Sequence, residues 1–321
     1  MTAPLYRFAV ISDVHIDLED SGKKTYFTYA EDNFLHALRT IKNLGCRFII
    51  SAGDQITNAS GGTAEWRRYR ELIAQSGYDG LILEALGNHE TRCAKYGCTL
   101  SHSLGEFLAY AGLEHKPVNL PSGKTYYEYL DPTCGDSFLF MALENGADAN
   151  LLDNFSAEQM DWVERLVEKR TKESRRIFLI QHAPIYAYGA GDRTDSPAYA
   201  GSIRMQDESG KPFPGNRRFK ALIECNKSLI WLSGHTHVDF ADNVNFANEA
   251  CRMLHVPALA GTTRIVADKS GGFTLDRTFR PQCAQGYLVE VYADKTIFQG
   301  YDFYSGDPIE KILFTIPRNS T

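Results

Sequence analysis

The sequence predicts an α/β fold, in which strands that run parallel are covered by helices. Three short apolar segments have the length and composition of buried strands, at residues 6–12, 48–50 and 81–86. The segment between the first two has helical periodicity, because Phe34, Leu38 and Ile41 share one face of a helix. Strands that alternate with helices in this way are typical of a parallel sheet.

Each helix has a local signal. The pattern Thr28-Tyr29-Ala30-Glu31 is a capping box and predicts the start of the first helix, which Gly45 ends. A second helix is predicted around residues 66–73. A further capping box at Ser156-Ala157-Glu158-Gln159 begins a third helix. Further strands are expected at residues 126–130, 137–143, 177–180 and 229–232, with a hairpin at 287–292 and 296–301.

Residues 186–215 form the one long stretch without periodicity, rich in Gly, Pro, Ser and Asp. A loop of this length inside a compact domain usually has a function, so we expect a substrate-side insertion here. The sequence has no obvious interdomain linker, which predicts a single domain over residues 1–321.

Composition narrows the function classes. The net charge of −6 and the isoelectric point near 5.9 give no global basic field, which argues against a nucleic-acid partner. No apolar run approaches the roughly 18 residues of a membrane span, and residues 1–10 do not resemble a signal peptide. We therefore expect a cytoplasmic protein without a membrane partner, whose oligomeric state the sequence does not indicate.

Five polar motifs each follow an apolar strand. In chain order they are Asp13-Val14-His15, Gly53-Asp54, Gly87-Asn88-His89-Glu90, His182 and Gly234-His235-Thr236-His237. Open α/β sheets bind their ligands at the carboxyl ends of the strands. Asp-x-His alone occurs by chance in roughly a third of chains of this length, but the ordered set falls to about one in 100,000. Chance therefore does not explain the set, and the alternative to a working site is an inherited site that is inactive.

The residue types indicate a metal centre. Carboxylates, imidazoles and an amide oxygen are ligands for divalent manganese, iron or zinc. Seven such side chains can fill two sites if one carboxylate bridges, and two metals about 3.5–4 Å apart can clamp both oxygens of a phosphoryl displacement. The adjacent glycines allow sharp turns and close approach.

The motif series resembles the calcineurin-like metallophosphoesterase family, whose five motifs are all intact between residues 13 and 237. The resemblance implies a four-layer α/β/β/α sandwich of two mixed β-sheets flanked by helices. It also implies two divalent metal ions (Mn, Fe or Zn). The first would be bound by Asp13, His15, Asp54 and His237. The second would be bound by Asp54, Asn88, His182 and His235, with Asp54 as the bridge.

The implied activity is hydrolysis of a phosphate ester. A hydroxide that bridges the metals would attack phosphorus, Asn88 would stabilise charge on the phosphoryl oxygens, and His89 would protonate the leaving group. Glu90 is expected either to orient His89 or to be a solvated loop charge. Purple acid phosphatases, which resemble this family, have a metal-binding Tyr where this chain has Thr57, so that iron site is not expected.

The substrate is less defined. Tyr188, Arg193 and Arg204 in the 186–215 loop are candidates for binding it, and Asp239 is expected either to support a ligand histidine or to form a turn. The favoured function is hydrolysis of a small phosphodiester or phosphomonoester, nucleotide-like and possibly a cyclic nucleotide, with the diester preferred. The alternatives are a nuclease and a non-catalytic interaction protein on the same scaffold.

Overall fold

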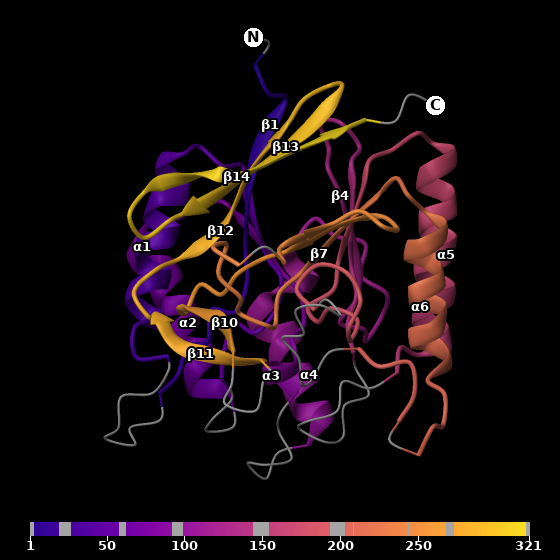
Figure 1. Ribbon diagram of the computed structural model, residues 1–321, viewed down its shortest axis with the longest axis horizontal. Helices are drawn as coiled ribbons and strands as arrows, with labels where there is room; N and C mark the ends of the chain where they lie inside the picture. The colour runs from indigo at the N-terminus through magenta and orange to yellow at the C-terminus, as the bar shows by residue number, and fades with distance from the viewer. Residues whose placement is uncertain are drawn as a thin grey trace.

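The structure is a computed structural model that describes residues 3–18, 27–57, 62–91, 99–143, 154–192, 203–207, 209–242, 244–267 and 273–318. Two six-stranded sheets face each other, and helices cover their outer faces (Figure 1). The predicted four-layer sandwich is therefore confirmed.

The first sheet has the strand order β14-β13-β12-β1-β2-β3. Its strands are β1 (Tyr6–Ile11), β2 (Phe48–Ser51), β3 (Leu81–Glu84), β12 (Gln285–Val291), β13 (Lys295–Asp302) and β14 (Asp307–Pro317). The first three strands are parallel, whereas β12, β13 and β14 add to β1 in antiparallel order, so the sheet is mixed. The crossovers between the parallel strands are α1 (Ala30–Asn43) and α2 (Thr63–Ser76), as the alternation of strand and helix predicts.

The second sheet has the strand order β4-β5-β6-β7-β9-β8 and is also mixed. Its strands are β4 (Tyr127–Leu130), β5 (Ser137–Phe140), β6 (Ile177–Ile180), β7 (Leu229–Ser233), β8 (Phe246–Ala247) and β9 (Arg252–His255). The four strands β5, β6, β7 and β9 are parallel. The helices α5 (Ala157–Lys172) and α6 (Pro214–Cys225) lie along its outer face (Figure 1).

The remaining described elements are short or lie outside the two sheets. They are α3 (Asn88–Thr91), α4 (Leu100–Ala111), a 3-10 helix (Leu113–His115) and a separate hairpin of β10 (Thr262–Ala267) with β11 (Phe273–Arg280). No helix in the described ranges combines the length and the apolar character that crossing a membrane requires.

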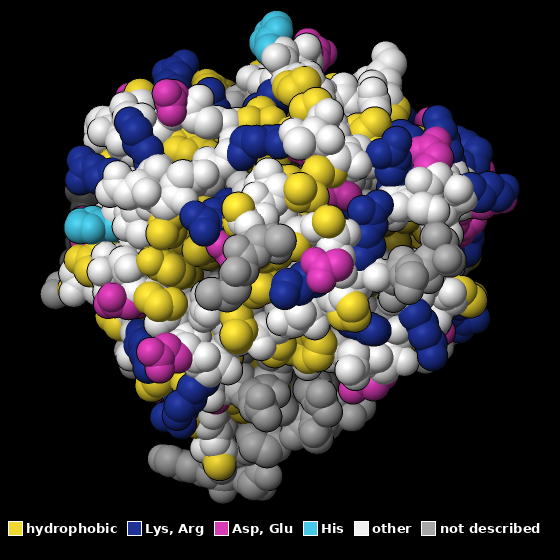
Figure 2. All heavy atoms as spheres, turned by 90° about the horizontal axis from the view of Figure 1, so that it is seen from above, with side chains coloured by type: hydrophobic (Ala, Val, Ile, Leu, Met, Phe, Trp, Pro, Cys, Tyr) yellow, Lys and Arg dark blue, Asp and Glu magenta, His cyan; other side chains and the backbone are white. Residues whose placement is uncertain are grey.

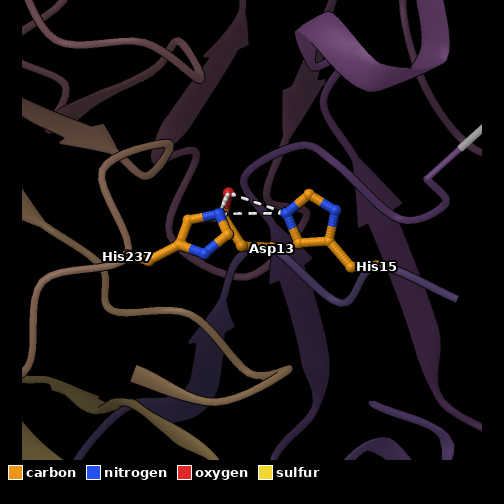
Figure 3. Close-up of side chains that lie close together, drawn as sticks. All are labelled: Asp13, His15 and His237. Carbon is orange, nitrogen blue, oxygen red and sulfur yellow. Dashed lines mark hydrogen bonds and ion pairs between the residues drawn. The ribbon is translucent and has the colours of Figure 1, made fainter. Parts of the chain in front are cut away.

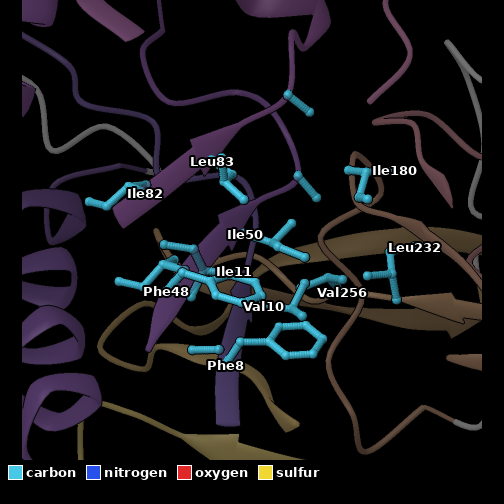
Figure 4. Packing of buried hydrophobic residues seen from close by; sticks show 14 of the residues in the cluster. Phe8, Val10, Ile11, Phe48, Ile50, Ile82, Leu83, Ile180, Leu232 and Val256 are labelled. Carbon is cyan, nitrogen blue, oxygen red and sulfur yellow. The ribbon is translucent and has the colours of Figure 1, made fainter. Parts of the chain in front are cut away.

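Strand alternation divides the core into layers. Along β6, Phe178 and Ile180 belong to the large cluster between the sheets, whereas Leu179 belongs to the cluster that includes residues of α5 and α6. The ring of Phe8 meets the ring of Phe178 edge-on across the two sheets, with their centroids 5.6 Å apart. Figure 4 shows side chains of the first sheet meeting Ile180 and Leu232 of the second. This packing holds the two sets of strand ends at fixed positions relative to each other.

The carboxyl-terminal strands belong to the same core. β12 pairs with β1, and Phe298 on β13 and Ile316 on β14 lie in the same buried cluster as Phe8. The strands after residue 284 therefore complete the first sheet.

Several features of the fold differ from the sequence prediction. The capping box predicted at Thr28 is wrong, because Tyr29 is the N-cap of α1 and its side chain makes no capping bond. The helix start predicted at Ser156 is confirmed, because Ser156 Oγ accepts a hydrogen bond from the backbone N–H of Gln159. The reciprocal bond of a capping box is not formed, because the Gln159 side chain bonds the backbone of Ala142 instead. The helix α6 was not predicted, because its N-cap is Phe213 and no capping side chain announces it.

Candidate metal centre

The seven predicted ligands gather where the parallel strands end. Asp13 and His15 follow β1, Asp54 follows β2, His182 follows β6, and His235 and His237 follow β7. Asn88 begins α3, four residues after β3. The carboxyl ends of strands in both sheets thus meet at one place, as the motif positions predict.

The first cluster joins Asp13, His15 and His237 (Figure 3). The Nε2 atom of His237 lies 3.0 Å from Asp13 Oδ1 and 3.0 Å from His15 Nε2. His15 Nε2 is also 3.6 Å from Asp13 Oδ1 and 3.8 Å from Asp54 Oδ2. Three ligand atoms therefore converge on one point, and a fourth lies next to them.

The second cluster joins Asp54, His182 and His235, whose ligand atoms lie within 4.8 Å of one another. His182 Nε2 is 3.1 Å from Asp54 Oδ2. Asn88 joins this cluster, because its Oδ1 lies 2.8 Å from His235 Nδ1. The Oδ2 atom of Asp54 faces both clusters, which is the position that a bridging carboxylate requires.

The donor set fits metal ions. Asp13 Oδ1 and His182 Nε2 are buried, and neither makes a hydrogen bond within the described structure. Such an atom costs about 1–3 kcal/mol unless it gains a partner. Burial alone would lower the pKa of His182, but the charges of Asp54 and Asp13 raise it to about 9. The carboxylates thus favour a positive charge at the centre, and a divalent cation would supply it.

The carboxylates themselves remain ionised. Burial raises the pKa of Asp13, but His237 and His182 more than offset this and hold it well below its usual range. The pKa of Asp54 is likewise lowered, because His182 and His89 outweigh its burial. Both groups are therefore ready to bind a cation at neutral pH.

The backbone at the ligands is strained. The described residues include seven non-glycine residues with positive φ, and five of them are predicted ligands. They are Asp13, His15, Asp54, His235 and His237, with φ between 49° and 77°. This conformation costs about 1–3 kcal/mol for each residue and persists only where the surroundings enforce it. Its concentration here is independent evidence for a functional site.

The glycines of the motifs leave room for the ligands. A Cβ atom on Gly87 would collide with Asp54, and one on Gly234 would collide with Ser12 and Asp13. Any larger residue would displace a ligand carboxylate, so the sequence prediction of close approach is correct at both positions.

Glu90 has a structural role that the sequence did not reveal. Its side chain is buried, and its carboxylate accepts hydrogen bonds from the backbone N–H groups of Asp54, Gln55, Ile56 and Gly87. Burial and the charge of Asp54 raise the pKa of Glu90, and the hydrogen bonds from Gly87 and Ile56 oppose this rise and favour the carboxylate. The solvated charge expected as one alternative is wrong, and its hydrogen bonds hold the backbone around Asp54 rather than the ring of His89.

Other buried groups orient the imidazoles. His182 Nδ1 donates to Ala52 O at 2.9 Å, which leaves Nε2 for the cluster. Thr236 lies between two ligands, and its hydroxyl contacts Nε2 of buried His255 at 2.8 Å. His255 Nδ1 in turn contacts Asn245 Oδ1 at 2.8 Å. His255 is the last residue of β9. Neither this strand nor the role of His255 was predicted, because His255 belongs to no sequence motif.

His89 lies beside the clusters and is more accessible than they are. Its Nδ1 donates to Thr57 O at 3.0 Å, and its Nε2 lies 3.9 Å from Asp54 Oδ2. His89 can also be grouped with His15 and Asp54 as a third possible metal cluster. The Thr57 hydroxyl donates to Glu65 at 2.6 Å, so the residue at the position of the purple acid phosphatase tyrosine bonds an acidic side chain instead.

The predicted substrate-binding residues are not brought to the clusters by any contact among the described residues. The Tyr188 hydroxyl donates to Glu224 on α6. The Arg204 guanidinium stacks on the ring of Tyr186, 5.0 Å from its centroid. Arg193 lies outside the described residues. Asp239 has the predicted turn role, because it accepts from the N–H of Ala241.

A family model described as calcineurin-like phosphoesterase matches residues 6–239, a range that includes every ligand of both clusters. The chain belongs to the calcineurin-like phosphoesterase family. This metallophosphoesterase family depends on two metal ions, and membership indicates a metal-dependent phosphoric ester hydrolase. No curated protein matches the sequence.

Two solved structures share the fold of this calcineurin-like phosphoesterase. A dimetal phosphatase from Danio rerio has a TM-score of 0.58 and 15% identity, over 98% of this chain and 100% of that chain. A purple acid phosphatase from yellow lupin (Lupinus luteus) seeds has a TM-score of 0.56 and 13% identity, over 97% of this chain and 53% of that chain. At these identities the similarity establishes the architecture alone.

Proposed function

We propose that this calcineurin-like phosphoesterase hydrolyses a phosphodiester of a small, nucleotide-like molecule, with two divalent cations held by the seven predicted ligands. The observation that carries the proposal is the position of Asp54. Its Oδ2 lies 3.1 Å from His182 Nε2 in one cluster and 3.8 Å from His15 Nε2 in the other. One carboxylate can therefore serve two cations. We also treat residues 1–321 as one domain, because β12, β13 and β14 complete the first sheet.

In this proposal the ligands divide between two sites. Asp13, His15, His237 and Asp54 would hold the first cation, and Asp54, Asn88, His182 and His235 the second. Bound divalent cations of manganese, iron or zinc would supply Lewis acidity and a water molecule of lowered pKa.

In this proposal, His89 acts as the general acid. The hydrogen bond from Nδ1 to Thr57 O fixes the ring, and Nε2 is turned toward the clusters. In the imidazolium form, Nε2–H donates its proton to the leaving oxygen while Nδ1–H stays bonded to Thr57. Its side chain is 15% exposed, compared with 2% for Asp54 and 0% for His15. A substrate can therefore approach His89 from solvent.

In this proposal, Asn88 binds a phosphoryl oxygen. Its Oδ1 points to His235, which leaves the amide Nδ2 as a donor. A donor fixed before the reaction stabilises charge that develops on the phosphoryl group.

The small number of cationic side chains at the metal centre supports a phosphodiester as the substrate. Among the described residues, no Lys or Arg forms an ion pair with Asp13 or Asp54. A diester carries one negative charge and a monoester about two at neutral pH, so a diester needs less added positive charge. The expected cytoplasmic location and the small-molecule substrate belong to the same proposal.

The test compares a chromogenic phosphodiester with its matching monoester, using protein stripped with a chelator and then repleted with manganese. We expect a metal-dependent rate that is higher on the diester. A rate on the monoester alone would reject the diester preference and keep the esterase. Absence of hydrolysis on both esters and on single-stranded DNA, with two metals bound, would reject the esterase itself. Hydrolysis of DNA alone would favour the nuclease alternative.

A further inference from the structure

A cavity of about 240 Å³ lies at the end of the second sheet opposite the metal ligands. It is bounded by the residues that precede β6 and β7, by residues at the start of β7, β9 and β13, and by residues at the end of α5 and β14. Because β6, β7 and β9 are parallel, their amino ends lie together and face away from His182 and His235. A strand of this length spans about 15 Å, so the cavity is separate from the metal centre.

The lining of this basic cavity is strongly cationic and has no acidic side chain. Its residues are Arg175, Arg176, Lys227, Arg252 and Arg318, the hydroxyl residues Thr171, Ser174, Ser228 and Thr296, and Ile230, Ile316 and Pro317. Five cations meet in a protein whose net charge is −6. Figure 2 looks onto the molecule from above Figure 1, where the chain ends, and Lys and Arg side chains are frequent on the right of that face.

Most of these charges are not neutralised. Lys227 and Arg252 form no ion pair with any residue in the described ranges, and Arg318 donates only to backbone carbonyls. Arg175 lies 3.8 Å from Glu173, but Glu173 is already bonded to Arg170 at 2.8 Å. A carbonyl acceptor orients a guanidinium without cancelling its charge.

Arg176 adds a buried charge to the cavity wall. It is 7% exposed, and its Nε and Nη1 atoms make no hydrogen bond within the described structure. Its one hydrogen bond runs from Nη2 to Tyr292 O, and Asp136 lies 3.7 Å from Nη1. Asp136 Oδ2 also accepts from the Tyr6 hydroxyl at 2.7 Å, and Asp136 Oδ1 makes no hydrogen bond within the described structure. A buried guanidinium with partners this incomplete favours an anion close by.

We propose that the basic cavity binds a small anion that carries two or more linked phosphate groups. Guanidinium forks and hydroxyls are the groups that recognise phosphate oxygens. Five cations on several elements exceed what a single phosphate can contact, so a linked pair or triplet of phosphates matches them better. The volume is below the roughly 300–1,000 Å³ of pockets for drug-sized molecules, which suits a compact polyphosphate or a phosphorylated headgroup. The site goes beyond the proposed esterase activity and does not depend on it.

The test is calorimetric titration of inorganic tripolyphosphate into the chelated full chain, with the Lys227→Ala/Arg252→Ala double variant beside it. Both residues are at least partly exposed and have no ion pair, so the variant should fold, and its melting temperature checks this. Each lost charge-assisted hydrogen bond weakens binding by about tenfold or more, so the double variant should bind about 100-fold more weakly. Lys311→Ala, which removes an exposed charge on β14 outside the cavity, should bind like the wild type.

Three outcomes would overturn the proposal. They are no binding of tripolyphosphate by the wild type, equal binding by the double variant, and binding of single phosphate as tight as that of tripolyphosphate. Sedimentation with vesicles that contain a bisphosphorylated inositol lipid then separates the two sources of this chemistry. Sedimentation that the double variant loses supports a lipid headgroup at this site. Tripolyphosphate binding without sedimentation supports a free polyphosphate there.

Discussion

The strands β6 and β7 run between two charged ends that are built in different ways. At their carboxyl ends, His182 and His235 join carboxylates in a buried centre that favours cations. At their amino ends, Arg176 and Lys227 line a cavity with no acidic side chain. The same scaffold thus separates a cation site from an anion site.

The two ends differ most in how firmly their groups are held. At the metal end, short side chains are fixed by positive φ angles, by glycines that admit no Cβ, and by Glu90. At the basic end, long side chains reach the cavity from several elements, and their hydrogen bonds go mainly to backbone carbonyls. Metal ligands must be placed within a few tenths of an ångström, whereas an anion accepts many arrangements of cations.

The largest loss of activity is expected from Asp54→Asn, which removes the carboxylate charge that faces both ligand clusters. Loss of metal binding removes several kcal/mol of transition-state stabilisation, so kcat/KM should fall about 1,000-fold or more. Metal content by mass spectrometry should fall with it. The control is Asp307→Asn, the same change at the exposed start of β14. Two metals retained in Asp54→Asn would contradict the bridging role.

The next effect on kcat/KM is expected from His89→Ala, which should leave the metal ligands in place. Loss of a general acid lowers turnover by about 100- to 10,000-fold, and both metals should remain bound. Exposed His102 on α4 provides the control, His102→Ala. Because His89 also groups with His15 and Asp54, loss of one metal in His89→Ala would show that it is a ligand instead.

Glu90→Gln tests the support beneath the metal end. In this variant the side-chain NH₂ group of Gln would face backbone N–H groups that bond the Glu90 carboxylate in the wild type. Two donors would then face each other, and the backbone around Asp54 would lose hydrogen bonds. Weakened support of a ligand typically costs about 10- to 100-fold in metal affinity, which a competitive chelator titration measures. Glu168→Gln, at an exposed ion pair on α5, should leave the affinity unchanged. An equal loss in both variants would deny Glu90 a specific role.

The metal end could be predicted from the sequence because each ligand lies in a short motif directly after a strand. Its supports could not be predicted, because they act across the chain. Glu90 bonds Gln55, 35 positions away, and His255 contacts Thr236, 19 positions away. The basic cavity has no motif, since its cations come from segments as distant as Arg175 and Arg318. The helix α6 was missed for a local reason, the absence of a capping side chain at Phe213.

The smallest effect is expected from Lys227→Ala/Arg252→Ala on ester hydrolysis. Charges about 15 Å from the metal centre exceed the roughly 8–10 Å screening length at physiological salt. The kcat/KM for the chromogenic diester should therefore stay within about twofold of the wild type. A tenfold change without bound polyphosphate would show that the two ends are coupled rather than independent.

The most direct measurement is anomalous diffraction from crystals of the manganese-repleted protein. We expect two peaks on either side of Asp54. One should be bound by Asp13, His15 and His237, and the other by Asn88, His182 and His235. A single peak, or a peak bound by His89, would contradict the proposed two-metal centre.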